Sequence, residues 1–151
     1  MRRNVLTTLP SLARMRGLSM IEVLVAIVII SLGLLGMAGL QASSLRGSQS
    51  AVYRAQAVQF AADMAERMRA NLGASRSYTF ALGGAAPSGT SVMDLDRADW
   101  LARLATLPGG LGSIAIDAVN NVATITVQWD DSRAGGSPTA TYTLVTRIWN
   151  N

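Results

Sequence analysis

The sequence predicts an α+β fold, in which a long N-terminal helix packs through its second half against a small antiparallel three-stranded sheet. Three observations lead to this fold. Between Gly17 and Arg46 the single charged residue is Glu22, as expected for one long apolar helix. An amphipathic pattern then continues to about Leu72. The last third of the chain holds three short segments in which apolar and polar residues alternate.

The distribution of charge divides the chain. Of its 13 basic residues, four precede Gly17, and the other nine are balanced by nine acidic residues. The folded part therefore has no excess of positive charge, which disfavours nucleic acid as a partner. We expect a basic leader (1–17), a transmembrane half of the helix (18–45), an amphipathic half (46–72), a connecting region with a short helix (73–112) and a β meander (113–151).

The long apolar segment allows three interpretations. From Val23 to Leu45 there are 23 residues without a charged side chain, which as a helix span about 35 Å and are long enough for a bilayer. A secretory signal peptide cut after Ala42 would have a shorter apolar region. A plain single-pass anchor remains possible, as does a leader that is cleaved before the apolar segment.

Glu22 favours cleavage before the apolar segment. A carboxylate inside a bilayer is costly, and a plain anchor gains nothing from it. Cleavage after Gly17 would create an α-amino group on Leu18, one helical turn from Glu22, and this amine could neutralise the carboxylate. The simpler alternative is a glutamate that reaches the lipid headgroups.

The segment Arg14-Met15-Arg16-Gly17-Leu18-Ser19-Met20-Ile21-Glu22 resembles the class III leader of type IV pilins and type II secretion pseudopilins. In that family a prepilin peptidase cuts after the glycine and methylates the new N-terminus, and the fifth mature residue is Glu. The resemblance implies cleavage between Gly17 and Leu18, N-methylation of Leu18 and a role of Glu22 in assembly. Most family members have Phe where this chain has Leu18.

Among pilins, the chain most resembles PilV-type minor pilins. The resemblance implies a subunit of the inner membrane, spanning it once, with a periplasmic C-terminal domain, that primes assembly and enters the pilus. Its partners would be the prepilin peptidase, other minor and major pilins, inner-membrane lipid and the assembly platform. A minor pseudopilin of type II secretion and a membrane-tethered periplasmic binding module that never polymerises are the alternatives.

The composition disfavours an enzyme. The chain has neither cysteine nor histidine, and it lacks phosphate-binding and nucleophile motifs. Two groups of carboxylates could in principle bind a cation or transfer protons. The first consists of Asp94, Asp96 and Asp99, and the second of Asp130 and Asp131. We interpret both groups as solvated structural residues. We therefore predict no catalytic residue, no cofactor and no metal.

The glycines of the apolar helix have two compatible explanations. Gly33, Gly36 and Gly39 recur every third residue, which allows helices to pack closely. They also weaken the helix locally, so that the segment could become extended. Further along, Asp63 and Arg67 are spaced to form an ion pair on one helix face.

Local signals place the remaining elements. A helix should end near Asn71-Leu72-Gly73, with Gly73 near the left-handed conformation. Ser91 and Asp94 resemble a capping box for a short helix at 95–107 with Trp100, Leu101 and Leu104 inward. The three strands are expected at 113–118, 122–129 and 141–149, with Asn120-Asn121 in a tight turn.

Overall fold

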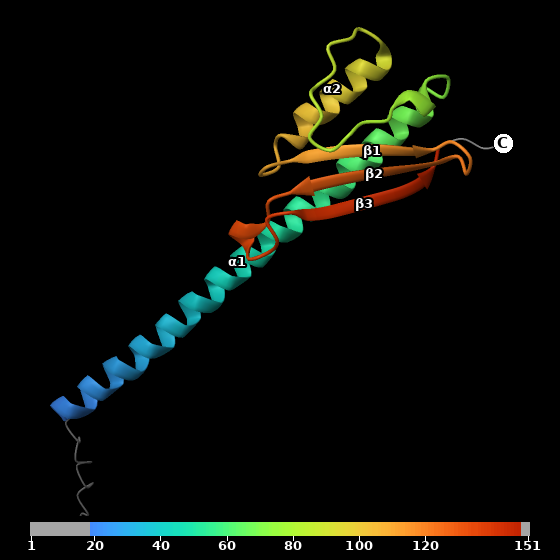
Figure 1. Cartoon of the computed structure of the whole chain (residues 1–151). Helices are drawn as coiled ribbons and strands as arrows, with labels where there is room; N and C mark the ends of the chain where they lie inside the picture. Colours follow the sequence, from blue (N-terminus) through green and yellow to red (C-terminus); the bar gives the residue numbers. More distant parts are fainter. Residues whose placement is uncertain (1–18, 149–151) are drawn as a thin grey trace, which may run out of the picture. The chain divides into compact units, whose positions relative to one another are not determined.

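The computed structural model describes residues 19–148 and confirms the α+β fold (Figure 1). Its helices are α1 (Met20–Ala70) and α2 (Val92–Leu104), and its strands are β1 (Leu111–Asp117), β2 (Val122–Trp129) and β3 (Ala140–Arg147). Short 3₁₀ turns lie at Ser75–Ser77 and Ser132–Ala134. The chain divides into two compact units after Leu40, and each is described by itself below.

The sheet is the predicted meander. Its strand order is β1-β2-β3, with both pairs antiparallel and Ile114, Ile125 and Leu144 in register. The β1–β2 turn spans four residues, in which Asn121 has φ of 57°, a conformation that Asn tolerates better than most residues. The Asp117 carboxylate accepts the amides of Val119 and Asn120 and fixes this turn.

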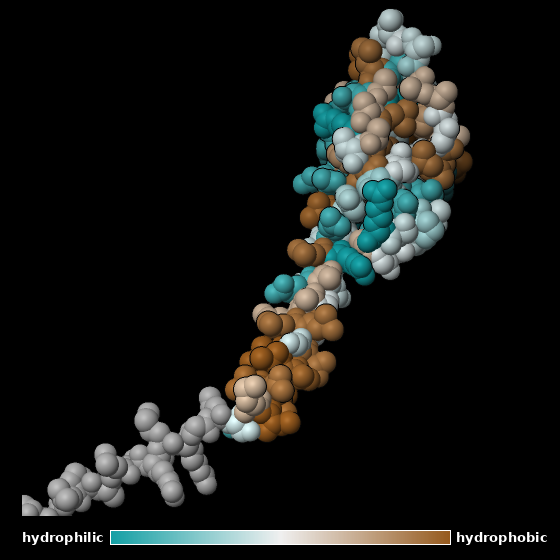
Figure 2. Space-filling model, turned by 90° about the vertical axis from the view of Figure 1, so that its left-hand side faces the viewer, coloured by the Kyte–Doolittle hydropathy of each residue, from teal (hydrophilic) through white to brown (hydrophobic). Residues whose placement is uncertain are grey.

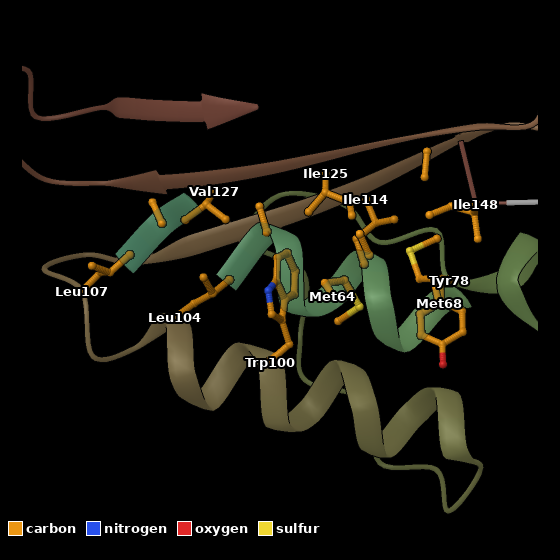
Figure 3. Close-up of a cluster of buried hydrophobic side chains, with 14 of the residues drawn as sticks. Met64, Met68, Tyr78, Trp100, Leu104, Leu107, Ile114, Ile125, Val127 and Ile148 are labelled. Carbon is orange, nitrogen blue, oxygen red and sulfur yellow. The ribbon is translucent and has the colours of Figure 1, made fainter. Parts of the chain in front are cut away.

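The core lies between the sheet and the two helices (Figure 3). Inward residues of β2 alternate with half-buried residues, which include Thr124 and Thr126, so that one face of the sheet is buried. Trp100 of α2 is fully buried, and its indole N–H donates to the carbonyl of Phe60 in α1 at 2.9 Å. The helices contribute Ala57, Ala61, Met64, Ala65, Met68, Trp100 and Leu104, and the sheet contributes Ile114, Ala123, Ile125, Val127 and Trp129.

A glycine in β1 makes room for this packing. A Cβ at Gly112 would lie 2.3 Å from the ring of Trp100 and 2.5 Å from the side chain of Leu104. A larger residue would therefore push α2 away from the sheet. Gly112 lets β1 and α2 approach closely enough to enclose the indole.

The short helix begins and ends earlier than predicted. Ser91 is its N-cap, as its hydroxyl accepts the amide of Asp94 at 3.2 Å, but the helical residues start immediately afterwards at Val92. The helix stops after Leu104 because the chain doubles back over that end. A Cβ at Gly110 would lie 1.9 Å from the Leu104 carbonyl oxygen, which leaves no space for a further turn.

The end of α1 also differs from the prediction. Helix α1 ends at Ala70, and Leu72, to which the amphipathic pattern was expected to continue, is 56% exposed. Gly73 does not adopt a left-handed conformation; the chain continues instead into the 3₁₀ turn at Ser75–Ser77, where the Ser75 hydroxyl donates to the Leu72 carbonyl. The third strand, predicted at 141–149, ends earlier, at Arg147, and Ile148 is not part of it; Trp149 lies outside the described residues.

Candidate assembly site

The N-terminal part of α1 exposes its apolar side chains. Every residue from Met20 to Leu40 is exposed, including Leu34 at 62% and Leu35 at 73%. Figure 2 shows this part of α1 as mostly apolar on the face that it presents. Among residues 19–148, α1 is the one helix long and apolar enough to cross a membrane, and its most apolar 18-residue window is 0% buried. Such a helix suits lipid or partner helices.

The backbone of this part is an unbroken helix. It continues through Gly33, Gly36 and Gly39, and a Cβ at any of them would meet nothing within 4 Å. The Ser31 hydroxyl donates to the Ile27 carbonyl at 2.7 Å, so its hydrogen-bond partner lies on the same helix. The extended conformation considered from the sequence is absent here, and no contact within residues 19–148 requires these glycines.

Glu22 lies in the first turn of α1. Its amide donates to the Ser19 carbonyl at 3.0 Å, and its side chain is exposed at the positive end of the helix dipole. Gly17 and Leu18 lie outside the described residues. The structure therefore places the carboxylate at the start of the helix, while the cleavage after Gly17, the methylation of Leu18 and the assembly role of Glu22 remain predictions.

The carboxylates near α2 form an ion-pair network with α1. The Arg67 guanidinium contacts Asp63 at 2.9 Å, as predicted, and also Asp96 at 3.3 Å and Asp99 at 2.5 Å. Arg103 contacts Asp99 at 3.1 Å. Burial opposes the charge of Arg67, but its hydrogen bond to Asp99 and the charge of Asp63 raise its pKa above the usual value. The network fastens α2 to α1.

Tyr78 extends this network to the segment after α1. It is fully buried, its hydroxyl donates to Asp96 at 2.5 Å, and it accepts a hydrogen bond from Asn71 at 3.1 Å. Burial, together with the hydrogen bond to Asp96, raises the pKa of Tyr78 to about 12. The phenol is therefore a neutral donor at physiological pH, and the arrangement is structural.

Two known families match the chain. Residues 12–38 match the prokaryotic N-terminal methylation motif, and residues 39–95 match the family described as type IV pilin Tt1218. The chain is type IV pilin-like, with a class III prepilin leader. No curated protein and no solved structure matches it significantly. The matches do not distinguish PilV-type minor pilins from other pilins.

The two matches correspond to different parts of this pilin-like chain. The methylation motif covers Gly17, Leu18 and Glu22 and most of the exposed apolar helix, whereas the pilin match covers the amphipathic part of α1 and reaches the start of α2. The sheet lies beyond both. The leader and α1 therefore carry most of the family signal.

Two carboxylates of this pilin-like chain are less solvated than expected. In Asp96 the side chain is 18% exposed, and Asp131 is only 6% exposed and accepts the Ser50 hydroxyl at 2.6 Å. Asp130 accepts hydrogen bonds from Ser132, which lower its pKa. Among residues 19–148, no group of three or more acidic residues is arranged for a metal ion.

Sequence reasoning missed the tertiary partners of these carboxylates. The pairing of Asp131 with Ser50 joins residues 81 positions apart, and no local spacing predicts it. A Cβ at Gly136 would lie 2.3 Å from an Asp131 carboxylate oxygen, so this glycine leaves room for the carboxylate against the backbone.

Proposed function

We propose that this chain is a minor pilin, without enzymatic activity, that helps to prime assembly of a type IV pilus after prepilin peptidase cuts between Gly17 and Leu18. The observation that carries the proposal is the exposed apolar helix Met20–Leu40, which starts with a carboxylate in its first turn and lies, up to Ala38, within the matched methylation motif. In this proposal the helix spans the inner membrane once and the sheet domain is periplasmic.

Glu22 is the proposed assembly sensor. A carboxylate at the centre of a membrane helix costs about 2.5–3.5 kcal/mol on insertion scales, and less near the edge. The α-amino group of Leu18, or that of a neighbouring subunit, would neutralise it. A subunit that docks its helix beside another then gains a charge pair in a medium of low dielectric constant, where an unpaired charge is expensive.

The first experiment tests processing. Gly17→Val should block cleavage, because the peptidase needs a small residue before the cut, and the precursor should accumulate in the inner membrane. Gly47→Val is the control: this glycine lies on α1, and a Cβ there meets nothing within 4 Å. The wild-type mature protein should begin at Leu18. A mature N-terminus at Ser43 would instead assign a conventional signal peptide.

The second experiment tests assembly. Glu22→Gln and Glu22→Ala, introduced at the chromosomal locus, should be cleaved and inserted normally but should reduce surface pili and the amount of the protein in sheared filaments. Glu66→Gln is the control, as Glu66 lies on α1 and pairs with Arg69 at the surface. Wild-type piliation with both Glu22 variants would contradict an assembly role and favour a glutamate that only reaches the headgroups.

A further inference from the structure

The free edge of the sheet can be identified from the hydrogen bonds of β1. Both main-chain groups of Ile114 bond to Phe80, at 2.8 Å each, so they point away from β2. In an antiparallel pair, opposite residues alternate between bonded and non-bonded positions. Ile125, which faces Ile114, therefore directs its own amide and carbonyl toward Leu144 in β3.

The same alternation fixes the outer edge of β3. Because Leu144 points toward β2, the amides and carbonyls of Thr141, Thr143 and Val145 point away from the sheet. None of them has a main-chain partner among residues 19–148. At the end of the strand the Arg147 carbonyl, which points the same way, accepts a hydrogen bond from Arg69 at 3.2 Å.

The two edges of the sheet are thus different. Phe80 pairs with β1 at its middle. In β3, the outward amides and carbonyls of Thr141, Thr143 and Val145 have no main-chain partner among residues 19–148. Soluble proteins protect such edges with charges, proline or bulges. From Ala140 to Thr146 β3 has no charged residue and no proline, and it pairs with β2 without a bulge.

The charge at this edge is also unbalanced. Arg147 is exposed and forms no ion pair with residues 19–148, and its neighbour across the sheet is Val122. The rest of the edge, Thr141, Thr143 and Val145, is exposed and uncharged. An occupant that matches this pattern is an extended, uncharged segment with a carboxylate opposite Arg147.

We propose that β3 accepts an extended strand from a different pilin-like subunit, which continues the sheet through main-chain hydrogen bonds and places a carboxylate beside Arg147. This inference rests on the proposed function for the identity of the partner. An edge of this kind gives affinity through the backbone and specificity through alternate side chains. The strand must cover at least five residues, or about 17 Å.

A second copy of the chain does not fit this edge. Head-to-tail stacking of β3 on the β1 of another copy is blocked, because Phe80 occupies the middle of β1. Pairing of two β3 strands, in either direction, places no carboxylate beside Arg147, because β3 itself holds no acidic residue.

The test uses the full chain in its own cell. Thr143→Pro removes an amide that faces outward, so the sheet should form while the added strand loses a hydrogen bond. We expect about tenfold less protein in sheared pili, with a normal amount of protease-resistant mature protein in membranes. Thr143→Ala, which keeps the amide, is the matched control. Arg147→Glu should also reduce incorporation.

A photo-cross-linking residue at Val145 identifies the occupant, and one at Val119, which is 89% exposed in the β1–β2 turn and lies outside β3, is the control. Adducts from Val145, and not Val119, to a strand of another prepilin-type subunit support the inference. Adducts to a second copy, or equal behaviour of Thr143→Pro and Thr143→Ala, overturn it. If the Val145 adduct forms in membranes but wild-type protein is absent from pili, the pilus function is wrong and the edge inference stands.

Discussion

The two parts of α1 differ in what covers them, although they form one helix of 51 residues. From Met20 to Leu40 no side chain is buried, and the helix is apolar on all sides. From Gln41 to Ala70 one face is buried against α2 and the sheet, and the other carries charges. The first part therefore makes no packing contacts within the domain, whereas the second part is held by its packing against α2 and the sheet. Substitutions in the two parts should therefore change the stability of the domain by different amounts.

The largest effect should follow loss of β3. A chain that ends at Thr139 should fail to fold beyond residue 40, because two strands leave the buried face of α1 uncovered. The apolar part should still insert into the membrane. The measurement is limited proteolysis of the mature protein in membranes. A protease-resistant domain in the shortened chain would show that β3 contributes little to the core.

Trp100→Ala should cost about 3–5 kcal/mol of unfolding free energy, because it empties the space enclosed by α1, α2 and β1. Leu34→Ala removes a side chain that touches nothing in its own domain and should leave this free energy unchanged. Pulse proteolysis of the full chain in detergent measures both. Similar losses from the two substitutions would contradict the division of α1.

Alkaline pH should destabilise the domain through Tyr78. Its pKa is raised to about 12 from an ordinary value near 10, so the folded state holds the phenol proton more tightly than the unfolded chain. The contribution of Tyr78 to the free energy of unfolding is fully present below about pH 10 and falls by about 2–3 kcal/mol as the pH rises toward 12. Tyr78→Phe should flatten this dependence. Tyr142→Phe is the control: it leaves Tyr78 in place, so the dependence of stability on pH should remain.

The smallest effect concerns two serines. Ser91→Ala removes the N-cap of α2 and should cost about 1 kcal/mol, measured by the same proteolysis. Ser31→Ala removes a hydroxyl that bonds only to the preceding turn of α1, so the stability of the domain should not change. A loss from Ser31→Ala equal to that from Ser91→Ala would indicate that the apolar part contributes to domain stability.

The sequence alone predicts the elements of this fold better than their tertiary contacts. Periodicity predicts α1 to within two residues at each end, and alternation predicts β2 at its observed bounds, because both patterns reflect a local face. The Asp63–Arg67 pair follows from helical spacing. The partners of Asp96 and Asp131 lie on other elements, and only the packed domain reveals that these carboxylates are shielded from water.

The leader shows the opposite case. Gly17 and Leu18 are recognised from their neighbours in sequence, and the matched methylation motif covers both. The proposed cleavage between them depends on the local sequence and not on tertiary structure. The free edge of β3, in contrast, depends on which way each amide points, and this follows from the register with β2 and from the bonds between Ile114 and Phe80.

The large sequence separation of two hydrogen bonds made by α1 determines the order in which its buried face can be covered during synthesis. The hydrogen-bond partner of Phe60, Trp100, is synthesised 40 residues later, and that of Ser50, Asp131, is synthesised 81 residues later. At about 5–20 residues per second, synthesis of 80 residues takes roughly 4–16 seconds. Until α2 has been synthesised, the face of α1 that holds Met64 and Met68 has no cover. Helix α2 can close over part of it first, the hairpin of β1 and β2 follows, and the Ser50–Asp131 bond completes the cover last.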